Sequence, residues 1–147
     1  MIDKESDYVV IEADEYDRSF LHLHPEIAVI TAMDADHLDI YGTHEELLKA
    51  FEEFALQIKG QLFLRKGLEL KRREITGHYA AGEKTDYYAD RLRVDNGSFL
   101  FDYIGKDIEI RDLRLCFPGR VNVENAMAAI TVALHTGVTA EEIREAL

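Results

Sequence analysis

The stretch Ile27-Ala-Val-Ile-Thr-Ala-Met-Asp-Ala-Asp-His-Leu-Asp-Ile-Tyr-Gly-Thr43 decides how the fold is interpreted, because an apolar run passes directly into acidic residues and an imidazole. The earlier stretch Tyr8-Val-Val-Ile-Glu-Ala-Asp-Glu15 has the same order, an apolar run followed by carboxylates. Short apolar runs are typical of buried parallel strands, and ligands of open α/β sheets bind at the carboxyl ends of such strands. We therefore expect an α/β protein in which strands at 8–13 and 27–31 open on one crevice.

The next elements are predicted from helix signals and apolar runs. Thr43 and Glu46 fit a capping box, and apolar residues recur at helical spacing until Gly60. A helix is therefore expected up to Gly60, followed by a strand over 61–65.

The second half of the chain has a different pattern. Residues 71–117 read as an antiparallel meander, and Asn96-Gly97 is a strong hairpin signal inside it. One helix is expected over 121–136, and another from Thr139, where Glu142 completes a capping box. The chain is thus expected to combine parallel strands and helices with an antiparallel meander.

The composition is that of an ordinary globular protein: of the 147 residues, 47% are hydrophobic and 31% are charged. This length suits one domain or part of one. The net charge of −12 argues against sequence-independent nucleic-acid binding, which depends on Lys and Arg neutralising phosphates. Cys116 is the only cysteine, no apolar run reaches membrane-spanning length, and the first residues lack the apolar core of a signal peptide. We therefore expect a cytoplasmic protein that binds neither nucleic acid nor membranes.

Glu12 and His37 are the leading candidates for a metal site. A hard cation such as Mg²⁺ prefers a few carboxylate oxygens and keeps its other positions for water and phosphate. Glu12 comes near the end of the first predicted strand. His37 lies among acidic residues that would raise its basicity or fix its tautomer, namely Asp34, Asp36 and Asp39. The competing interpretation is that acidic residues after a strand merely solvate a loop.

Residues 118–125, Pro-Gly-Arg-Val-Asn-Val-Glu-Asn, form the third candidate element. Plain helix initiation explains most of it, with Asn122 as the N-cap after the Pro-Gly turn. Asn125 is left unexplained, because Asn is a weak helix former and its amide could face a nucleobase edge.

Phosphate-binding and basic features are sparse. The 147 residues contain no Gly-rich loop ending in Lys-Ser/Thr, so a nucleotide would be only partly held by this chain. A basic patch is interpreted as a solvated face that could touch an acidic partner domain. It consists of Arg65, Lys66, Lys71, Arg72 and Arg73.

Three blocks of the sequence together resemble the Mur ligases, which are ATP-dependent amide-forming enzymes of peptidoglycan precursor synthesis. The blocks are Glu12-Ala-Asp-Glu15 with Ser19-Phe20, Asp36-His-Leu-Asp39 with Tyr41, and Pro118-Gly-Arg120 with Asn122 and Asn125. Family members have a UDP-binding domain, a central ATPase domain and a third domain that helps to hold the amino acid. The resemblance is to part of the central domain, without the phosphate loop that lies upstream in the family. Met1 is therefore expected to mark a truncated start.

The resemblance implies roles for individual residues. Glu12 and His37 would bind the magnesium ion that bridges the γ-phosphate of ATP and the substrate carboxylate. Asn125 would contact the adenine, with Arg120 and Asn122 beside it at the nucleotide.

The implied reaction joins L-alanine to UDP-N-acetylmuramate. ATP would phosphorylate the lactyl carboxylate, and the alanine amine would attack the acyl phosphate. The chain alone is expected to be inactive, because the phosphate loop and both flanking domains are missing. Three alternatives stay open: a related ligase that attaches a peptide to the same sugar nucleotide, a non-catalytic binding module, and a metal-dependent phosphohydrolase that uses Asp34, Asp36, His37 and Asp39.

Overall fold

The computed structural model of the chain describes residues 7–34, 38–71 and 73–147. Its strands form one sheet in the order β1-β2-β3-β4-β5-β6. The strands are β1 (Ile27–Ile30), β2 (Gln61–Arg65), β3 (Gly77–Ala81), β4 (Tyr87–Asp95), β5 (Ser98–Ile104) and β6 (Glu109–Leu115). β1 to β4 are parallel neighbours, whereas β4, β5 and β6 are antiparallel neighbours. The predicted α/β combination is confirmed, but the antiparallel part begins at β4 rather than at residue 71, because β3 pairs in parallel on both sides.

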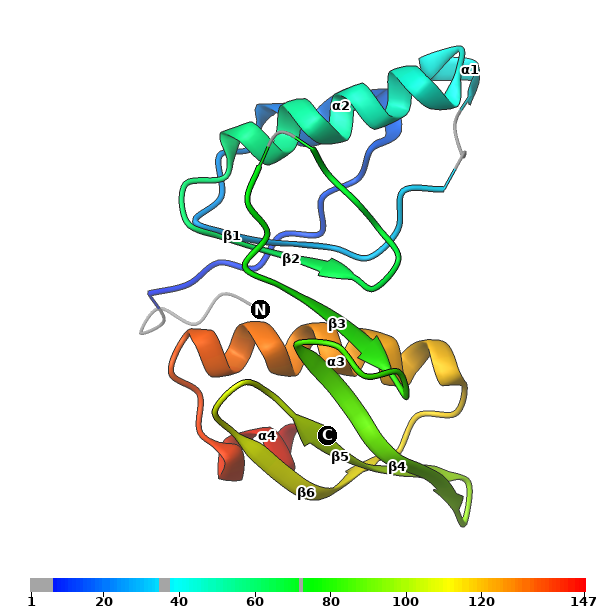
Figure 1. Cartoon of the computed structure of the whole chain (residues 1–147), viewed down its shortest axis with the longest axis vertical. Coiled ribbons are helices and arrows are strands. Elements are labelled where there is room, and N and C mark those ends of the chain that lie inside the picture. Colours follow the sequence, from blue (N-terminus) through cyan, green and yellow to red (C-terminus); the bar gives the residue numbers. More distant parts are fainter. Residues whose placement is uncertain (1–6, 35–37, 72) are drawn as a thin grey trace.

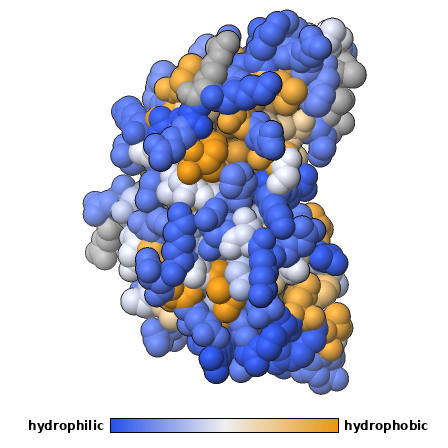
Figure 2. Space-filling model, in the orientation of Figure 1, coloured by the Kyte–Doolittle hydropathy of each residue, from blue (hydrophilic) through white to orange (hydrophobic). Residues whose placement is uncertain are grey.

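Helices cover both faces of the parallel part of the sheet. α2 (His44–Gln57) packs on one face and α3 (Arg120–His135) on the other (Figure 1). In β2, Leu62 and Leu64 pack in the core cluster of α2, while Phe63 packs in that of α3. Successive side chains of a strand point to opposite faces, so this apolar run is buried on both. The outer face drawn in Figure 2 is mostly hydrophilic, with apolar side chains in patches.

The helix predicted from Thr43 is confirmed, with a difference at each end. Thr43 Oγ1 accepts a hydrogen bond from the Glu46 backbone N–H at 3.3 Å, which caps the helix. The reciprocal half of the capping box is not formed, because the Glu46 carboxylate accepts from Lys49 Nζ at 2.5 Å instead. The helix ends at Gln57 rather than continuing to Gly60.

α3 begins one residue earlier than expected and is capped differently. Its N-cap is Gly119, whose φ of 100° is a conformation that Gly adopts without steric cost. The interpretation of Asn122 as the N-cap is therefore wrong. Asn122 lies inside the first turn, and its side-chain nitrogen donates to the Pro118 carbonyl at 2.5 Å. Within the described parts of the chain, no helix combines the length and apolar composition that a membrane span requires.

Two predictions from local turn and capping chemistry are confirmed. Asn96 and Gly97 join β4 to β5 with positive φ values of 47° and 81°, as a type I′ hairpin turn requires. α4 (Ala140–Ala146) starts after Thr139, and the capping box between Thr139 and Glu142 is complete. Both signals involve residues close in sequence, so they do not depend on the rest of the fold.

Residues 8–13, which were predicted to be a buried strand, belong to no strand. Val10 is 95% exposed and Val9 is 73% exposed, so the apolar run lies in solvent rather than in the sheet. A strand needs a neighbour that pairs with its backbone, and among the described residues no strand pairs with this segment. The strand prediction is therefore wrong for this chain, although the apolar pattern that suggested it is real.

Candidate functional site

The first acidic block forms a tight polar turn before the short 3-10 helix η1 (Tyr16–His22). The Asp14 carboxylate accepts a hydrogen bond from the Tyr16 backbone N–H at 2.8 Å, and the Asp14 carbonyl accepts one from Ser19 Oγ at 3.1 Å. Phe20 is buried, and its ring centre lies 5.3 and 5.2 Å from the centres of two phenylalanine rings of α2. The block is thus shaped by its own polar groups and anchored to α2 by an aromatic side chain.

The second acidic block contacts the first through Tyr41. This residue ends the short helix α1 (Leu38–Tyr41), and its phenol donates to the backbone carbonyl of Glu15 at 2.5 Å. The Arg18 guanidinium carbon lies 5.1 Å from the centre of the Tyr41 ring, within cation–π range. Tyr41 is buried, and burial raises the pKa of its phenol, so the hydroxyl remains a donor at neutral pH. The structure therefore brings the two acidic blocks side by side.

Of the predicted metal pair, Glu12 is exposed, whereas His37 lies outside the residues that the structure describes, as does Asp36. Asp34, from the second block, is also exposed. Exposed carboxylate oxygens fit the chemistry that a hard cation such as Mg²⁺ requires. Among the residues that are described, His, Cys, Asp and Glu form no group of three suited to a metal ion. The pairing of Glu12 with His37 stays a prediction.

The third block covers the N-cap of α3 and the first two turns of that helix. Arg120 Nη2 donates to the carbonyl of Ala81, the last residue of β3, at 3.0 Å. Asn122 is tied to the Pro118 carbonyl, whereas Asn125 is exposed. The N-terminus of α3 adds a partial positive charge, which favours negative ligands. Arg120 thus fixes the start of α3 to the sheet. Asn125, in the second turn, is open to solvent.

A cavity that was not predicted from the sequence lies where β2, β3 and α3 meet, with a volume of about 210 Å³. It is lined by Arg65, Lys66, Ala80, Ala81, Glu83, Arg120 and Glu124. Arg65 Nη1 lies 3.7 Å from Glu124 Oε2, and Lys66 Nζ lies 3.1 Å from Glu83 Oε2. Arg65 and Lys66, which were predicted to belong to a solvated basic face, are 34% and 41% exposed and also line this cavity beside acidic partners. One sequence signal could have pointed to this cavity: Arg65 is the last residue of the strand predicted over 61–65.

This cavity lies at the carboxyl ends of the parallel strands. Arg65 is the last residue of β2, and Ala81 is the last of β3. The last residue of β1, Ile30, pairs with Leu64, so the second acidic block leaves the sheet at the same edge. Ligands of open α/β sheets bind at this edge. The second and third blocks therefore share an edge of the sheet, and Tyr41 ties the first block to the second.

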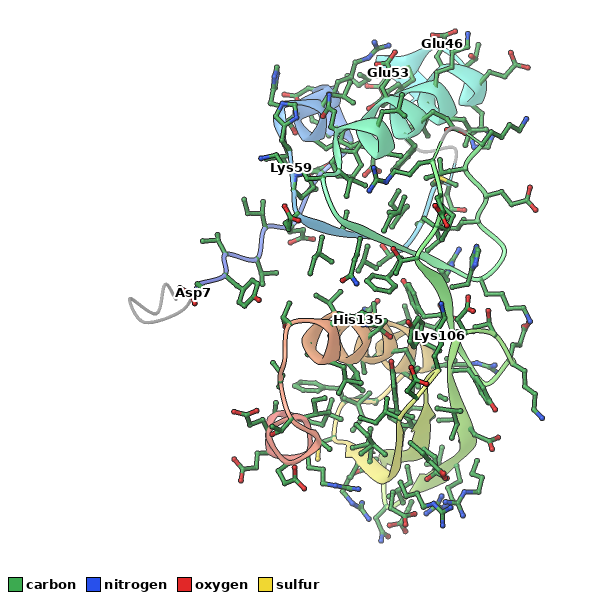
Figure 3. All side chains as sticks on the ribbon, turned by 60° about the vertical axis from the view of Figure 1, so that its left-hand side comes forward. Asp7, Glu46, Glu53, Lys59, Lys106 and His135 are labelled. Atoms are coloured by element: carbon green, nitrogen blue, oxygen red, sulfur yellow. The ribbon has the colours of Figure 1, made fainter. Side chains whose placement is uncertain are left out.

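Another cavity, of about 450 Å³, lies at the opposite ends of these strands. Its lining includes Tyr87 at the start of β4, His135 at the end of α3, and Lys106 (Figure 3). Tyr87 Oη lies 3.2 Å from His135 Nε2. The residues that line it include none of the predicted site residues, so the candidate site is at the carboxyl edge.

The chain is similar in sequence to a known family. It matches the Mur ligase middle domain over residues 1–133. It is 42% identical over 153 residues to the UDP-N-acetylmuramate–L-alanine ligase of Parabacteroides distasonis, which covers 100% of this chain and 33% of that protein. It is 42% identical over 140 residues to the enzyme of that name from Flavobacterium psychrophilum, covering 94% of this chain and 30% of that one. The chain therefore spans about a third of the length of these curated relatives.

Solved structures with the same fold agree with these matches. The UDP-N-acetylmuramate-alanine ligase of Thermotoga maritima aligns with a TM-score of 0.75 at 23% identity, over 92% of this chain and 31% of that one. A UDP-N-acetylmuramate:L-alanyl-gamma-D-glutamyl-meso-diaminopimelate ligase from Neisseria meningitides aligns with a TM-score of 0.74 at 25% identity, over 92% of this chain and 45% of that one. The expected fold class is confirmed.

Proposed function

Because this chain belongs to the Mur ligase family, as part of its middle domain, we propose that it carries nucleotide- and metal-binding residues of an ATP-dependent ligase joining L-alanine to UDP-N-acetylmuramate. Family membership supports a role in peptidoglycan precursor synthesis. The curated relatives named for alanine addition are 42% identical to this chain, which favours that amino acid. The activity of the whole protein is a proposal, because this chain spans about a third of those relatives.

One observation carries the proposal: the Tyr41 phenol joins the two acidic blocks by its 2.5 Å hydrogen bond to the Glu15 carbonyl. A shared cation requires ligands from both blocks to approach one point. This bond ties the side chain of Tyr41, four residues after His37, to the backbone of Glu15, three residues after Glu12. The second block also leaves the sheet beside the cavity at the carboxyl edge. A nucleotide at that edge would therefore have the acidic blocks on one side and the start of α3 on the other.

In the proposed reaction, ATP phosphorylates the lactyl carboxylate of UDP-N-acetylmuramate and ADP leaves. The amine of L-alanine then attacks the acyl phosphate, so that an amide bond forms and inorganic phosphate is released. Within this chain, the Asn125 amide is proposed to face the adenine edge, with Arg120 and Asn122 beside it, while Glu12 and His37 hold the metal. Bound magnesium would neutralise charge on the transferring phosphoryl group.

The remaining parts of such a ligase would come from the rest of the full-length protein. This chain contains no Gly-rich phosphate loop, so we expect it to be inactive alone. A UDP-binding domain and a domain that helps to hold the amino acid are proposed to flank it. The lone, exposed Cys116 suits a reducing cytoplasm, where we place the protein.

The test is alanine-dependent ADP release by the full-length protein with ATP, magnesium and UDP-N-acetylmuramate. Glu12→Ala and His37→Ala should each lower kcat/KM on the order of 100-fold, because each removes a charge-stabilising group at the reacting phosphate. Glu53 and His24 are both exposed, and Glu53 projects from the outer side of α2 (Figure 3), so Glu53→Ala and His24→Ala are matched controls. Near-normal turnover in Glu12→Ala or His37→Ala would refute the metal roles.

A ligase that attaches a peptide to the same sugar nucleotide is the second candidate, because the Neisseria enzyme named for such a reaction shares the fold at a TM-score of 0.74. The same assay separates the two. ADP release that depends on L-alanine, and not on L-alanyl-γ-D-glutamyl-diaminopimelate, supports alanine addition. The opposite dependence overturns it.

A further inference from the structure

We propose that Glu124 is a specificity-determining residue that hydrogen-bonds the ribose hydroxyls of the nucleotide, and that Arg65 positions it. The inference rests on the proposed function, since it concerns the same nucleotide. It assigns the cavity between β2, β3 and α3 to the sugar, a part of ATP for which the sequence suggested no ligand.

The carboxylate of Glu124 has the acceptor capacity that a vicinal diol needs. An ionised carboxylate offers about four lone-pair positions on two oxygens, and two neighbouring hydroxyls can donate to it together. Glu124 lines the cavity and is about one-third exposed, with a side-chain exposure of 32%. Arg65 Nη1 lies 3.7 Å from Glu124 Oε2, which is longer than a hydrogen bond, so acceptor positions remain for a ligand. Acidic side chains bind ribose hydroxyls in the same way at other nucleotide sites on parallel sheets.

The charges of the cavity favour a neutral hydroxylated group over a phosphate. Arg65 lies beside Glu124, and Lys66 lies beside Glu83. Two of the basic side chains that line the cavity therefore already face carboxylates. A phosphate placed here would meet both carboxylates at close range, which is unfavourable. A hydroxyl can both donate and accept, so it can pair with either charge.

The floor and size of the cavity favour a sugar over a base. The floor is made by Ala80 and Ala81, which offer no aromatic or broad apolar surface for stacking. Arg120 is fixed above that floor by its hydrogen bond to the Ala81 carbonyl at 3.0 Å. The volume of about 210 Å³ suits a small group, and the exposed Asn125 follows Glu124 directly in α3. A ribose in the cavity would place the attached base near the first turns of α3, where Asn125 is exposed.

The experiment compares ATP, 2′-deoxy-ATP and 3′-deoxy-ATP as substrates of the full-length protein in the alanine-dependent ADP-release assay. The unmodified protein should prefer ATP to each deoxy analogue by about tenfold in kcat/KM, the equivalent of one hydrogen bond to a charged acceptor. Glu124→Ala should lower kcat/KM by about 100-fold for ATP, because both hydroxyls lose their acceptor, and by about tenfold for each deoxy analogue, which loses its one remaining bond, so that the preference disappears. Arg65→Ala should weaken the preference, and Arg65→Lys should restore part of it, as a positioning role requires.

Glu83→Ala is the matched control, because it removes the other carboxylate of the same cavity and should keep the preference. Urea unfolding of each variant checks that the fold is retained. The proposal is overturned if the unmodified protein uses all three nucleotides equally, or if Glu124→Ala keeps the full preference. In both of these outcomes the protein still releases ADP in an alanine-dependent reaction. If instead the proposed ligase function is wrong, none of the three nucleotides supports alanine-dependent ADP release, so the two failures can be told apart.

Discussion

The Tyr41 phenol donates to the backbone carbonyl of Glu15 at 2.5 Å and thereby joins segments that lie 26 residues apart in the chain. Glu15 belongs to no strand, and this long-range bond and the packing of Phe20 help to position the first acidic block. The placement of Glu12 thus depends on tertiary contacts rather than on a strand. Removing the Tyr41–Glu15 bond should therefore change both the free energy of unfolding and the enzyme activity.

We predict that Tyr41→Phe weakens both the fold and the site. Phe keeps the buried ring but removes the donor, which leaves the Glu15 carbonyl without this partner. The free energy of unfolding should fall by about 1 kcal/mol. The KM for magnesium in the full-length protein should rise, because the acidic blocks are no longer held together. Urea unfolding and a magnesium titration check these results, with Tyr88→Phe on β4 as the control. An unchanged magnesium dependence would contradict the role given to Tyr41.

Asp102 is predicted to be the most stabilising carboxylate of the meander. It is buried at 2% exposure, its carboxylate bonds the Arg91 guanidinium, and it accepts from the Asp112 backbone N–H at 2.9 Å. Arg91 and Asp112 both have positive φ, of 49° and 52°, where the register of β4–β5 and β5–β6 shifts. One buried carboxylate therefore holds two irregular positions of the sheet in place.

Asp102→Ala should lower the free energy of unfolding by about 2–3 kcal/mol, because the Asp112 backbone N–H and the Arg91 guanidinium, whose side chain is 53% exposed, both lose the carboxylate that accepts from them. The neighbouring ion pair of Arg93 with Asp112 is exposed, at 47% and 61%, so Arg93→Ala should cost no more than about 1 kcal/mol. Urea unfolding of the 147-residue chain compares the two variants. Equal losses would contradict the special role of Asp102.

The capping box of α4 predicts a dependence of stability on acid. Hydrogen bonds from the Thr139 backbone N–H and then from its hydroxyl lower the pKa of the Glu142 carboxyl below its ordinary 4.5. A carboxyl with a lowered pKa in the folded state stabilises the fold above pH 4.5, and this stabilisation is lost as the pH falls through the folded pKa. Glu142→Gln should therefore lower the Tm at neutral pH and have little effect in strong acid. Thermal unfolding between pH 7 and about pH 2 tests this; a difference in Tm that does not change with pH would contradict it.

Features encoded by residues close in sequence could be predicted without a structure. The turn at Asn96-Gly97 and the capping box of Thr139 with Glu142 each need only a few residues in the right order, and both are confirmed. The apolar runs of β1 and β2 were also recognisable, because helices bury both faces of those strands.

Features that depend on distant partners could not be predicted. The run at 8–13 has the composition of a strand, but pairing decides whether a strand forms, and no strand of the described residues pairs with this segment. The cavity pairs Arg65 with Glu124, residues from a strand and a helix far apart in the sequence, so no local spacing reveals them. The side-chain rule predicted Asn122 as the N-cap, but the helix is capped at Gly119, three residues earlier, where a positive φ turns the chain.

The most direct test of the central claim is a crystal structure of the full-length protein with magnesium and a non-hydrolysable ATP analogue. The account predicts that a Glu12 carboxylate oxygen and a His37 ring nitrogen both lie within about 2.3 Å of one ion that also contacts the γ-phosphate. A structure in which Glu12 and His37 share no ion, with the nucleotide bound, would contradict it.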